Sequence, residues 1–115
     1  MDITRHEPSG ILSNAVVHGN IVYLAGIVAA DAERDVKGQT RQILDKIDHL
    51  LALSGSHKSR ILRVNIWLTD IQDRAAMNEV WMEWVDPANL PARACVEAKL
   101  ANPKLSVEIM VTAVR

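Results

Sequence analysis

Two stretches of helical periodicity, set between short runs of strand character, limit the folds open to this chain of 115 residues. In about 38–54 and about 71–85, apolar residues recur every three or four positions with polar residues between them. Each predicted helix has one apolar stripe, so we expect both helices to pack on one face of a single sheet. The other face of that sheet needs a cover. In a chain this small we expect a second copy of the chain to provide it, which predicts a homo-oligomer.

The strand-like runs predict a mixed sheet. They lie at 2–7, 15–18, 21–28, 58–68, 91–100 and 105–114, and the first of them is weak. Gly19-Asn20 separates the second run from the third and is a two-residue hairpin signal. The run 21–28 is almost entirely apolar, which favours a central strand covered on both faces. The order β-β-α-β-α-β-β, preceded by the N-terminal run, predicts an α+β fold.

Composition excludes several classes of protein. Thirteen basic residues against 14 acidic ones give a net charge of −1, which offers no basic patch for nucleic acid. The single cysteine excludes an internal disulfide and a cysteine-based zinc site, and the four histidines show no metal-ligand spacing. The N-terminus lacks the apolar run of a signal peptide, and no segment approaches the roughly 20 apolar residues of a membrane-spanning helix. We expect one cytoplasmic domain, 1–115, without nucleic-acid or membrane partners.

The run 91–100 carries the most unusual chemistry, because alternation places Arg93 and Cys95 together on one side of a strand. If this strand and the last one form an antiparallel hairpin with their apolar sides against the helices, Arg93, Cys95 and Glu108 face away from the helices. In the simplest register Arg93 lies opposite Thr112, and Glu108 is then roughly 13 Å further along the strand. Either the pairing is less simple, or one site combines residues from two subunits.

Several motifs, in order along the chain, resemble those of one family. They are Ser13-Asn-Ala-Val16, Gly19-Asn-Ile-Val-Tyr-Leu-Ala-Gly26, Gln39-Thr40, Met77-Asn-Glu-Val-Trp81, Pro91-Ala-Arg-Ala-Cys-Val-Glu97 and Asn102-Pro-Lys-Leu-Ser-Val-Glu-Ile109. The set resembles the Rid family, the reactive-intermediate deaminases or YjgF-like proteins. The resemblance implies a chorismate-mutase-like fold and a homotrimer whose sheets form a central barrel, with ligand clefts between subunits. It also implies hydrolysis of reactive enamines and imines to 2-keto acids and ammonia, with no metal or organic cofactor.

The resemblance also implies roles for individual residues. Arg93 matches the arginine that binds the substrate carboxylate, for which a guanidinium fork is well suited. Glu108 matches the glutamate that holds the attacking water, and a carboxylate there is able to take its proton. Cys95 matches a cleft cysteine whose backbone helps to bind ligand. Gly26 matches a glycine whose missing side chain lets a ligand approach the backbone.

Three further positions of the expected substrate pocket depart from the most-studied branch of the family. Leu12 stands where that branch has a tyrosine on the N-terminal loop. Ala25 and Ile27 flank Gly26 where that branch has Ser-Gly-Gln. A hydroxyl-bearing lid and two polar pocket groups are therefore replaced by apolar residues, which indicates a divergent branch.

These residues support three functional hypotheses. The first is a trimeric deaminase acting on small carboxylate-bearing intermediates of the 2-aminoacrylate or 2-iminobutanoate type. The second is a non-catalytic trimer that binds a small carboxylate, which the apolar Leu12 and Ile27 favour modestly. The third, a ribonuclease or translation inhibitor, is attached to some family members, and the neutral charge and the lack of a histidine acid/base pair argue against it here.

Overall fold

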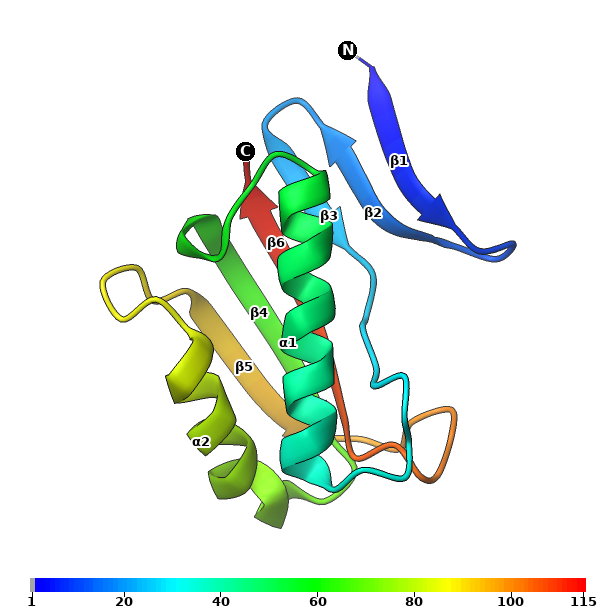
Figure 1. The fold of residues 1–115 in the computed structure, drawn as a ribbon, viewed down its shortest axis with the longest axis vertical. Helices are drawn as coiled ribbons and strands as arrows, with labels where there is room; N and C mark the ends of the chain where they lie inside the picture. Colours follow the sequence, from blue (N-terminus) through cyan, green and yellow to red (C-terminus); the bar gives the residue numbers. More distant parts are fainter. Residues whose placement is uncertain (1) are drawn as a thin grey trace.

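The computed structural model describes residues 2–115, so the first residue of the expected 1–115 domain lies outside the described residues. Within that range the chain forms one sheet of six strands and two α-helices (Figure 1). The strands are β1 (Ile3–Pro8), β2 (Ser13–His18), β3 (Ile21–Leu24), β4 (Ile61–Leu68), β5 (Ala92–Glu97) and β6 (Val107–Val114). The helices are α1 (Val36–Leu53) and α2 (Arg74–Trp84), and the short 3-10 turns are η1 (Lys58–Arg60) and η2 (Ile71–Asp73).

The hairpin predicted at Gly19-Asn20 is confirmed. Strands β2 and β3 pair antiparallel, with His18 opposite Ile21. Gly19 has a φ of 61°, a left-handed conformation that glycine adopts without steric cost. The weak N-terminal run is also a strand, because β1 pairs antiparallel with β2 and forms one edge of the sheet.

Both helices are confirmed, and their starting points follow from local capping. The Asp35 side chain accepts a hydrogen bond from the Gly38 N–H at 2.8 Å, so α1 begins at Val36, earlier than the periodicity alone indicated. The second helix begins later than expected. Asp70 caps the Gln72 N–H at 2.9 Å, residues 71–73 form the turn η2, and α2 starts only at Arg74.

The expected hairpin between the last two strands is wrong. The strand order is β1-β2-β3-β6-β4-β5, so β6 lies between β3 and β4, antiparallel to both, and β5 pairs in parallel with β4 at the other edge. Helix α2 connects β4 to β5, and such a crossover returns the chain to the starting end of the sheet, which makes the two strands parallel. The long connection after β5 then carries the chain to the gap between β3 and β4.

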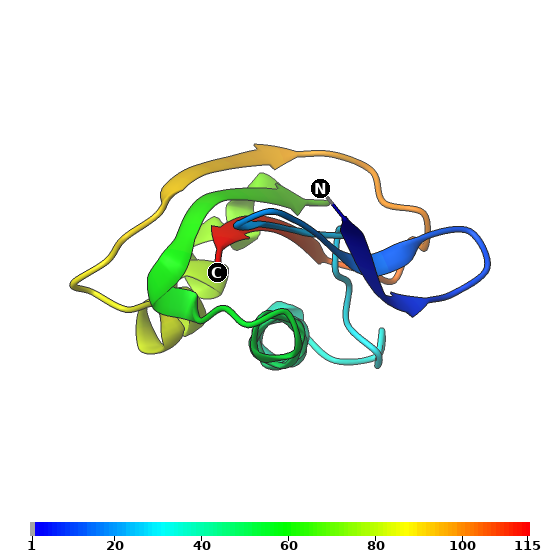
Figure 2. The ribbon, with the colours of Figure 1, turned by 90° about the horizontal axis from the view of Figure 1, so that it is seen from above.

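Both helices cover the same face of the sheet, as expected, and no helix or strand formed by residues 2–115 covers the other face (Figure 2). The core between helices and sheet is almost wholly aliphatic, with Ile43, Ile47, Leu50, Ile66 and Ile109 among its fully buried side chains. Strand β3 is central, but Tyr23 on its uncovered side is 48% exposed, so within one chain the strand is not covered on both faces. Among residues 2–115 no helix is both long and apolar enough to cross a membrane.

Candidate functional site

Arg93 and Cys95 point toward the helices, which corrects the expected orientation. Arg93 is paired with Val64 and Cys95 with Ile66, and both partners on β4 are buried in the core. Cross-strand partners in a sheet point to the same face, so Arg93 and Cys95 lie on the helix side. The alternating residues of β5, Ala92, Ala94 and Val96, lie on the uncovered side, where Val96 is 51% exposed.

The Arg93 guanidinium rests on helix α2. Its central carbon lies 5.4 Å from the centre of the Trp81 ring, within the range of a cation–π contact, and Trp81 itself is buried. Burial lowers the pKa of the Arg93 guanidinium; the neighbouring Cys95 opposes this shift and Arg74 adds to it. The arginine stays charged, because its pKa begins far above neutral pH. Cys95 is half-buried and packs against the core.

Glu108 lies on the opposite face. It is paired with Trp67 across β4 and β6, and it alternates with the buried Val107 and Ile109. Its carboxylate fills the space that a side chain at Gly26 would occupy, since a Cβ there would lie 2.2 Å from Oε2 of Glu108. The structure therefore brings together Gly26 and Glu108, two of the residues singled out from the sequence.

Arg93 and Glu108 are not brought together within one chain. Arg93 is in register with Val64, which pairs in turn with Val111 of β6. Their Cα atoms are thus two strands and three residues apart, a separation of roughly 14 Å at ordinary sheet spacings. Their side chains also leave opposite faces of the sheet. A small ligand that touches both groups has to take them from different subunits.

The three apolar positions near Gly26 have different environments. Ala25 is half-buried, and its N–H donates to the Asn14 carbonyl at 2.9 Å. Ile27 bridges to Ile109 and is buried on the helix side, so it serves the core. Leu12 is 45% exposed in the loop between β1 and β2, where its carbonyl accepts a hydrogen bond from the Ser9 N–H at 2.8 Å. Only Leu12 presents an apolar side chain to the exterior.

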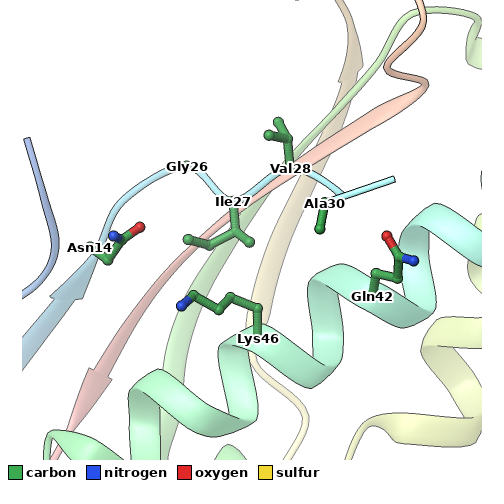
Figure 3. A pocket seen from close by; sticks show the side chains of 7 residues that line it. All are labelled: Asn14, Gly26, Ile27, Val28, Ala30, Gln42 and Lys46. Carbon is green, nitrogen blue, oxygen red and sulfur yellow. The ribbon is translucent and has the colours of Figure 1, made fainter. Parts of the chain in front are cut away.

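A cavity of about 310 Å³ lies between α1 and the segment that follows β3 (Figure 3). It is lined by Asn14, Gly26, Ile27, Val28, Ala30, Gln42 and Lys46. Figure 3 shows Lys46 reaching from α1 toward the Asn14 end, with Gln42 at the other end. The cavity includes two of the predicted residues, Gly26 and Ile27, but neither Arg93 nor Glu108.

Sequence reasoning missed the polar residues of this cavity, Asn14, Gln42 and Lys46. Lys46 Nζ forms an ion pair with Glu7 at 2.6 Å, and His49 Nε2 lies 2.6 Å from the other oxygen of the same carboxylate. The hydrogen bond from Lys46, followed by that from His49, holds the pKa of Glu7 below its usual value. A signal was present, because Gln42, Lys46 and His49 are polar residues at helical spacing along one side of the apolar stripe of α1.

From the sequence, Gln39 was identified only as part of a motif. In the structure its side-chain amide bonds the segment that precedes β6. It is 1% exposed. Its Oε1 accepts from the Ser106 N–H at 2.8 Å, and its Nε2 donates to the carbonyls of Arg34 at 2.9 Å and Lys104 at 3.2 Å. Because Ser106 lies two residues before Glu108, this amide fixes the segment that presents the carboxylate. Within residues 2–115 no group of three His, Cys, Asp or Glu side chains is arranged to hold a metal ion.

Comparison with known proteins identifies relatives along nearly the whole chain. A family model described as Endoribonuclease L-PSP matches residues 3–115. A RutC family protein of Haemophilus influenzae is 46% identical over 114 residues, which cover 98% of this chain and 98% of that protein. The protein named 3-aminoacrylate deaminase RutC in Acinetobacter baylyi is 36% identical over 96 residues, which cover 78% of this chain and 75% of that protein.

Solved structures agree with the sequence relatives. NMB1025 of Neisseria meningitidis, a member of the YjgF protein family, superposes with a TM-score of 0.97 at 42% identity and covers 100% of this chain and 96% of its own. YyfA of Yersinia pestis, from the conserved Rid protein family, has a TM-score of 0.88 at 29% identity, with 94% and 90% of the two chains covered. The family model, the sequence relatives and the shared fold together show that this chain belongs to the Rid/YjgF family.

Proposed function

We propose that the protein, as a single domain of residues 1–115, hydrolyses reactive enamines and imines of the 2-aminoacrylate or 2-iminobutanoate type to 2-keto acids and ammonia. A relative at 36% identity is named a 3-aminoacrylate deaminase, which supports deamination as the reaction class. The observation that carries the proposal is the pair of Gly26 and Glu108. The missing side chain of Gly26 leaves room for the Glu108 carboxylate itself, the group that holds the attacking water in this proposal.

The reaction needs two functions from the protein. The Arg93 guanidinium binds the substrate carboxylate with two parallel hydrogen bonds and so orients the imine carbon. Glu108 holds a water molecule, takes one of its protons as the oxygen bonds to that carbon, and returns a proton to the nitrogen. The hydroxyl of the resulting adduct then loses its proton and the nitrogen gains a second one, so that the carbon–nitrogen bond breaks, ammonia leaves and the carbonyl of the keto acid forms. Neither residue changes oxidation state, and the step consumes only water.

The site is completed between subunits of a homotrimer in this proposal. The uncovered sheet face carries exposed apolar residues, Tyr23 and Val96 among them, which favours coverage by another copy of the chain. Arg93 lies on the edge strand β5, and its distance from Glu108 within one chain favours a cleft that joins the two from neighbouring subunits. The number three follows from the family resemblance, and a cytoplasmic location is part of the proposal.

The test is complementation between two inactive variants. A pyridoxal-phosphate dehydratase supplies 2-iminobutanoate from threonine, and formation of 2-oxobutanoate is followed with and without the protein. We expect Arg93→Ala and Glu108→Gln each to lose most of the acceleration. When the two variants are unfolded together and refolded as mixed trimers, about a quarter of the sites combine an intact Arg93 with an intact Glu108, if the two come from different subunits. Recovered activity near that fraction supports the shared site.

Each part of the proposal has its own contrary result. Mixed trimers that stay inactive contradict the shared site but do not contradict the proposed reaction. Wild-type protein that gives no acceleration, or Arg93→Ala that performs like wild type, contradicts the deaminase for these substrates. The exposed apolar side chain of Leu12, in place of a hydroxyl, favours one alternative, a trimer that binds a small carboxylate without turnover. Saturable binding of 2-oxobutanoate with no acceleration would establish that alternative.

A further inference from the structure

A second arginine lies on the helix face against which Arg93 packs. Arg74, Asn78 and Trp81 are spaced by four and three residues along α2, so they share one face of the helix. The central carbon of the Arg93 guanidinium lies 5.4 Å from the centre of the Trp81 ring on this face. Arg74 lies about two helical turns before Trp81, on the side of α2 that faces β5. Arg74, which is exposed, and the Arg93 guanidinium therefore lie on the same side of α2.

No acidic group among residues 2–115 forms an ion pair with either arginine. Within residues 2–115, neither Arg74 nor Arg93 forms an ion pair with a carboxylate or donates a side-chain hydrogen bond that the geometry supports. Glu97 shares the face of Arg93 on β5, but its Oε1 accepts the Ile71 N–H at 3.0 Å. The proximity of Arg74 also contributes to lowering the pKa of Arg93, as expected for two like charges.

One further observation favours an anion at this place. Arg74 is the first residue of α2, where the helix dipole is unfavourable for a positive side chain and favourable for a bound anion.

We propose that Arg74 binds a second acidic group of the substrate, so that the preferred substrates are 2-imino acids with a carboxylate at the end of the side chain. This inference rests on the proposed function, because it takes Arg93 as the anchor of the first carboxylate. Arg93 holds the carboxylate next to the imine carbon, and Arg74 holds the distal one. The hydrolysis itself is unchanged: water adds to the imine carbon and ammonia leaves.

Product analogues test this without turnover. Calorimetric titration of the intact oligomer compares 2-oxopentanoate, with one carboxylate, with 2-oxoglutarate, which has the same number of carbons and two carboxylates. Oxaloacetate is one carbon shorter than 2-oxoglutarate and 2-oxoadipate is one carbon longer, so the series tests which distance between carboxylates fits the two arginines. We expect at least one dicarboxylate to bind about tenfold more tightly than 2-oxopentanoate, the effect of one charge-assisted hydrogen bond. Arg74→Gln should abolish that difference and leave the affinity for 2-oxopentanoate unchanged.

The controls separate this inference from the function on which it rests. Arg5→Gln, on the edge strand β1 at the far side of the sheet, should leave every affinity unchanged. Equal binding of mono- and dicarboxylates by the wild type, or a dicarboxylate preference that survives in Arg74→Gln, overturns the role of Arg74 even if the deaminase is active. Absence of binding by every keto acid overturns it as well. Failure of the proposed function shows itself differently, as an absence of accelerated imine hydrolysis.

Discussion

Gly26 and Glu108 occupy adjoining space across the sheet: a Cβ on Gly26 would lie 2.2 Å from Oε2, 3.0 Å from Cδ and 3.4 Å from Cγ of Glu108. The backbone of Gly26 does not need the left-handed region, since its φ is not among the positive ones. The glycine is therefore required for space and not for conformation. Its absent side chain allows the carboxylate to lie next to the place where the proposed water binds.

Gly26→Ala should therefore reduce activity far more than stability. The added methyl group meets the end of a flexible side chain, so Glu108 can move aside with a change in unfolding free energy of about 0.5 kcal/mol or less. A displaced carboxylate no longer holds the water, and we expect at least a tenfold loss of kcat. Urea unfolding and imine hydrolysis measure the two effects. A variant that loses its fold, or one that keeps full activity, contradicts this interpretation.

Local patterns predicted the elements of this fold but not every neighbour relation. Helical periodicity located α1 and α2, and Gly19-Asn20 located the hairpin of β2 and β3, because both signals depend on residues close in sequence. The position of β6 in the sheet, in contrast, does not depend on residues close in sequence. Its insertion between β3 and β4 depends on how two crossover connections leave a gap, and nothing within Val107–Val114 encodes that gap. The simplest hairpin was therefore the wrong choice.

The orientation of β5 shows the limit of alternation. The strand has a small apolar side, with Ala92 and Ala94, and a side with Arg93 and Cys95, and the apolar side was expected to face the helices. In the structure the aromatic Trp81 offers a surface on which the Arg93 guanidinium packs, and the small residues are left on the uncovered face. If a second copy of the chain covers that face, as proposed, this edge strand has no solvent side, and polarity alone does not assign its faces.

Arg93→Met should separate the charge of Arg93 from its packing. Methionine keeps an unbranched stem against Trp81 but removes the guanidinium. Since burial lowers the pKa of Arg93, the folded state disfavours its charge, and we expect the melting temperature to stay the same or rise slightly. Loss of the carboxylate anchor should raise KM by about tenfold to a hundredfold. Arg5→Met on the far edge of the sheet is the matched control, and an unchanged KM in Arg93→Met would exclude the anchor role.

Gln39→Leu should destabilise the fold through unpaired backbone groups. The substitution keeps the volume of the side chain but leaves the Ser106 N–H and the carbonyls of Arg34 and Lys104 without their partner. We expect a loss of about 3 kcal/mol in urea unfolding, because each buried unsatisfied group costs about 1–3 kcal/mol. Gln42→Leu, one turn further along α1, removes the Oε1 that accepts one hydrogen bond from the exposed Asp31 N–H. This substitution should lower the unfolding free energy by less than about 1 kcal/mol. Equal effects of the two substitutions would contradict the role of Gln39.

The Glu7 cluster predicts a pH-dependent contribution to stability. Hydrogen bonds from Lys46 and then His49 hold the Glu7 pKa below the ordinary value of 4.5. A carboxyl group whose pKa is lower in the folded state stabilises the fold above the unfolded pKa, and this contribution is lost as the pH falls through the folded pKa. Glu7→Gln should therefore lower the melting temperature at pH 7 by a few degrees at most, since the pair lies near the surface.

The difference between wild type and Glu7→Gln should shrink below pH 4.5 and vanish once the wild-type carboxyl is protonated. Thermal unfolding of both proteins between pH 7 and pH 3 measures it. Glu79→Gln is the matched control for a surface ion pair, because Lys37 lowers the pKa of Glu79 in the same way but at a place remote from β1. Glu7 also fixes Asn14 of the cavity, since the Asn14 amide donates to the Glu7 carbonyl at 2.9 Å. A constant difference at all pH values would contradict the role of the Glu7 charge.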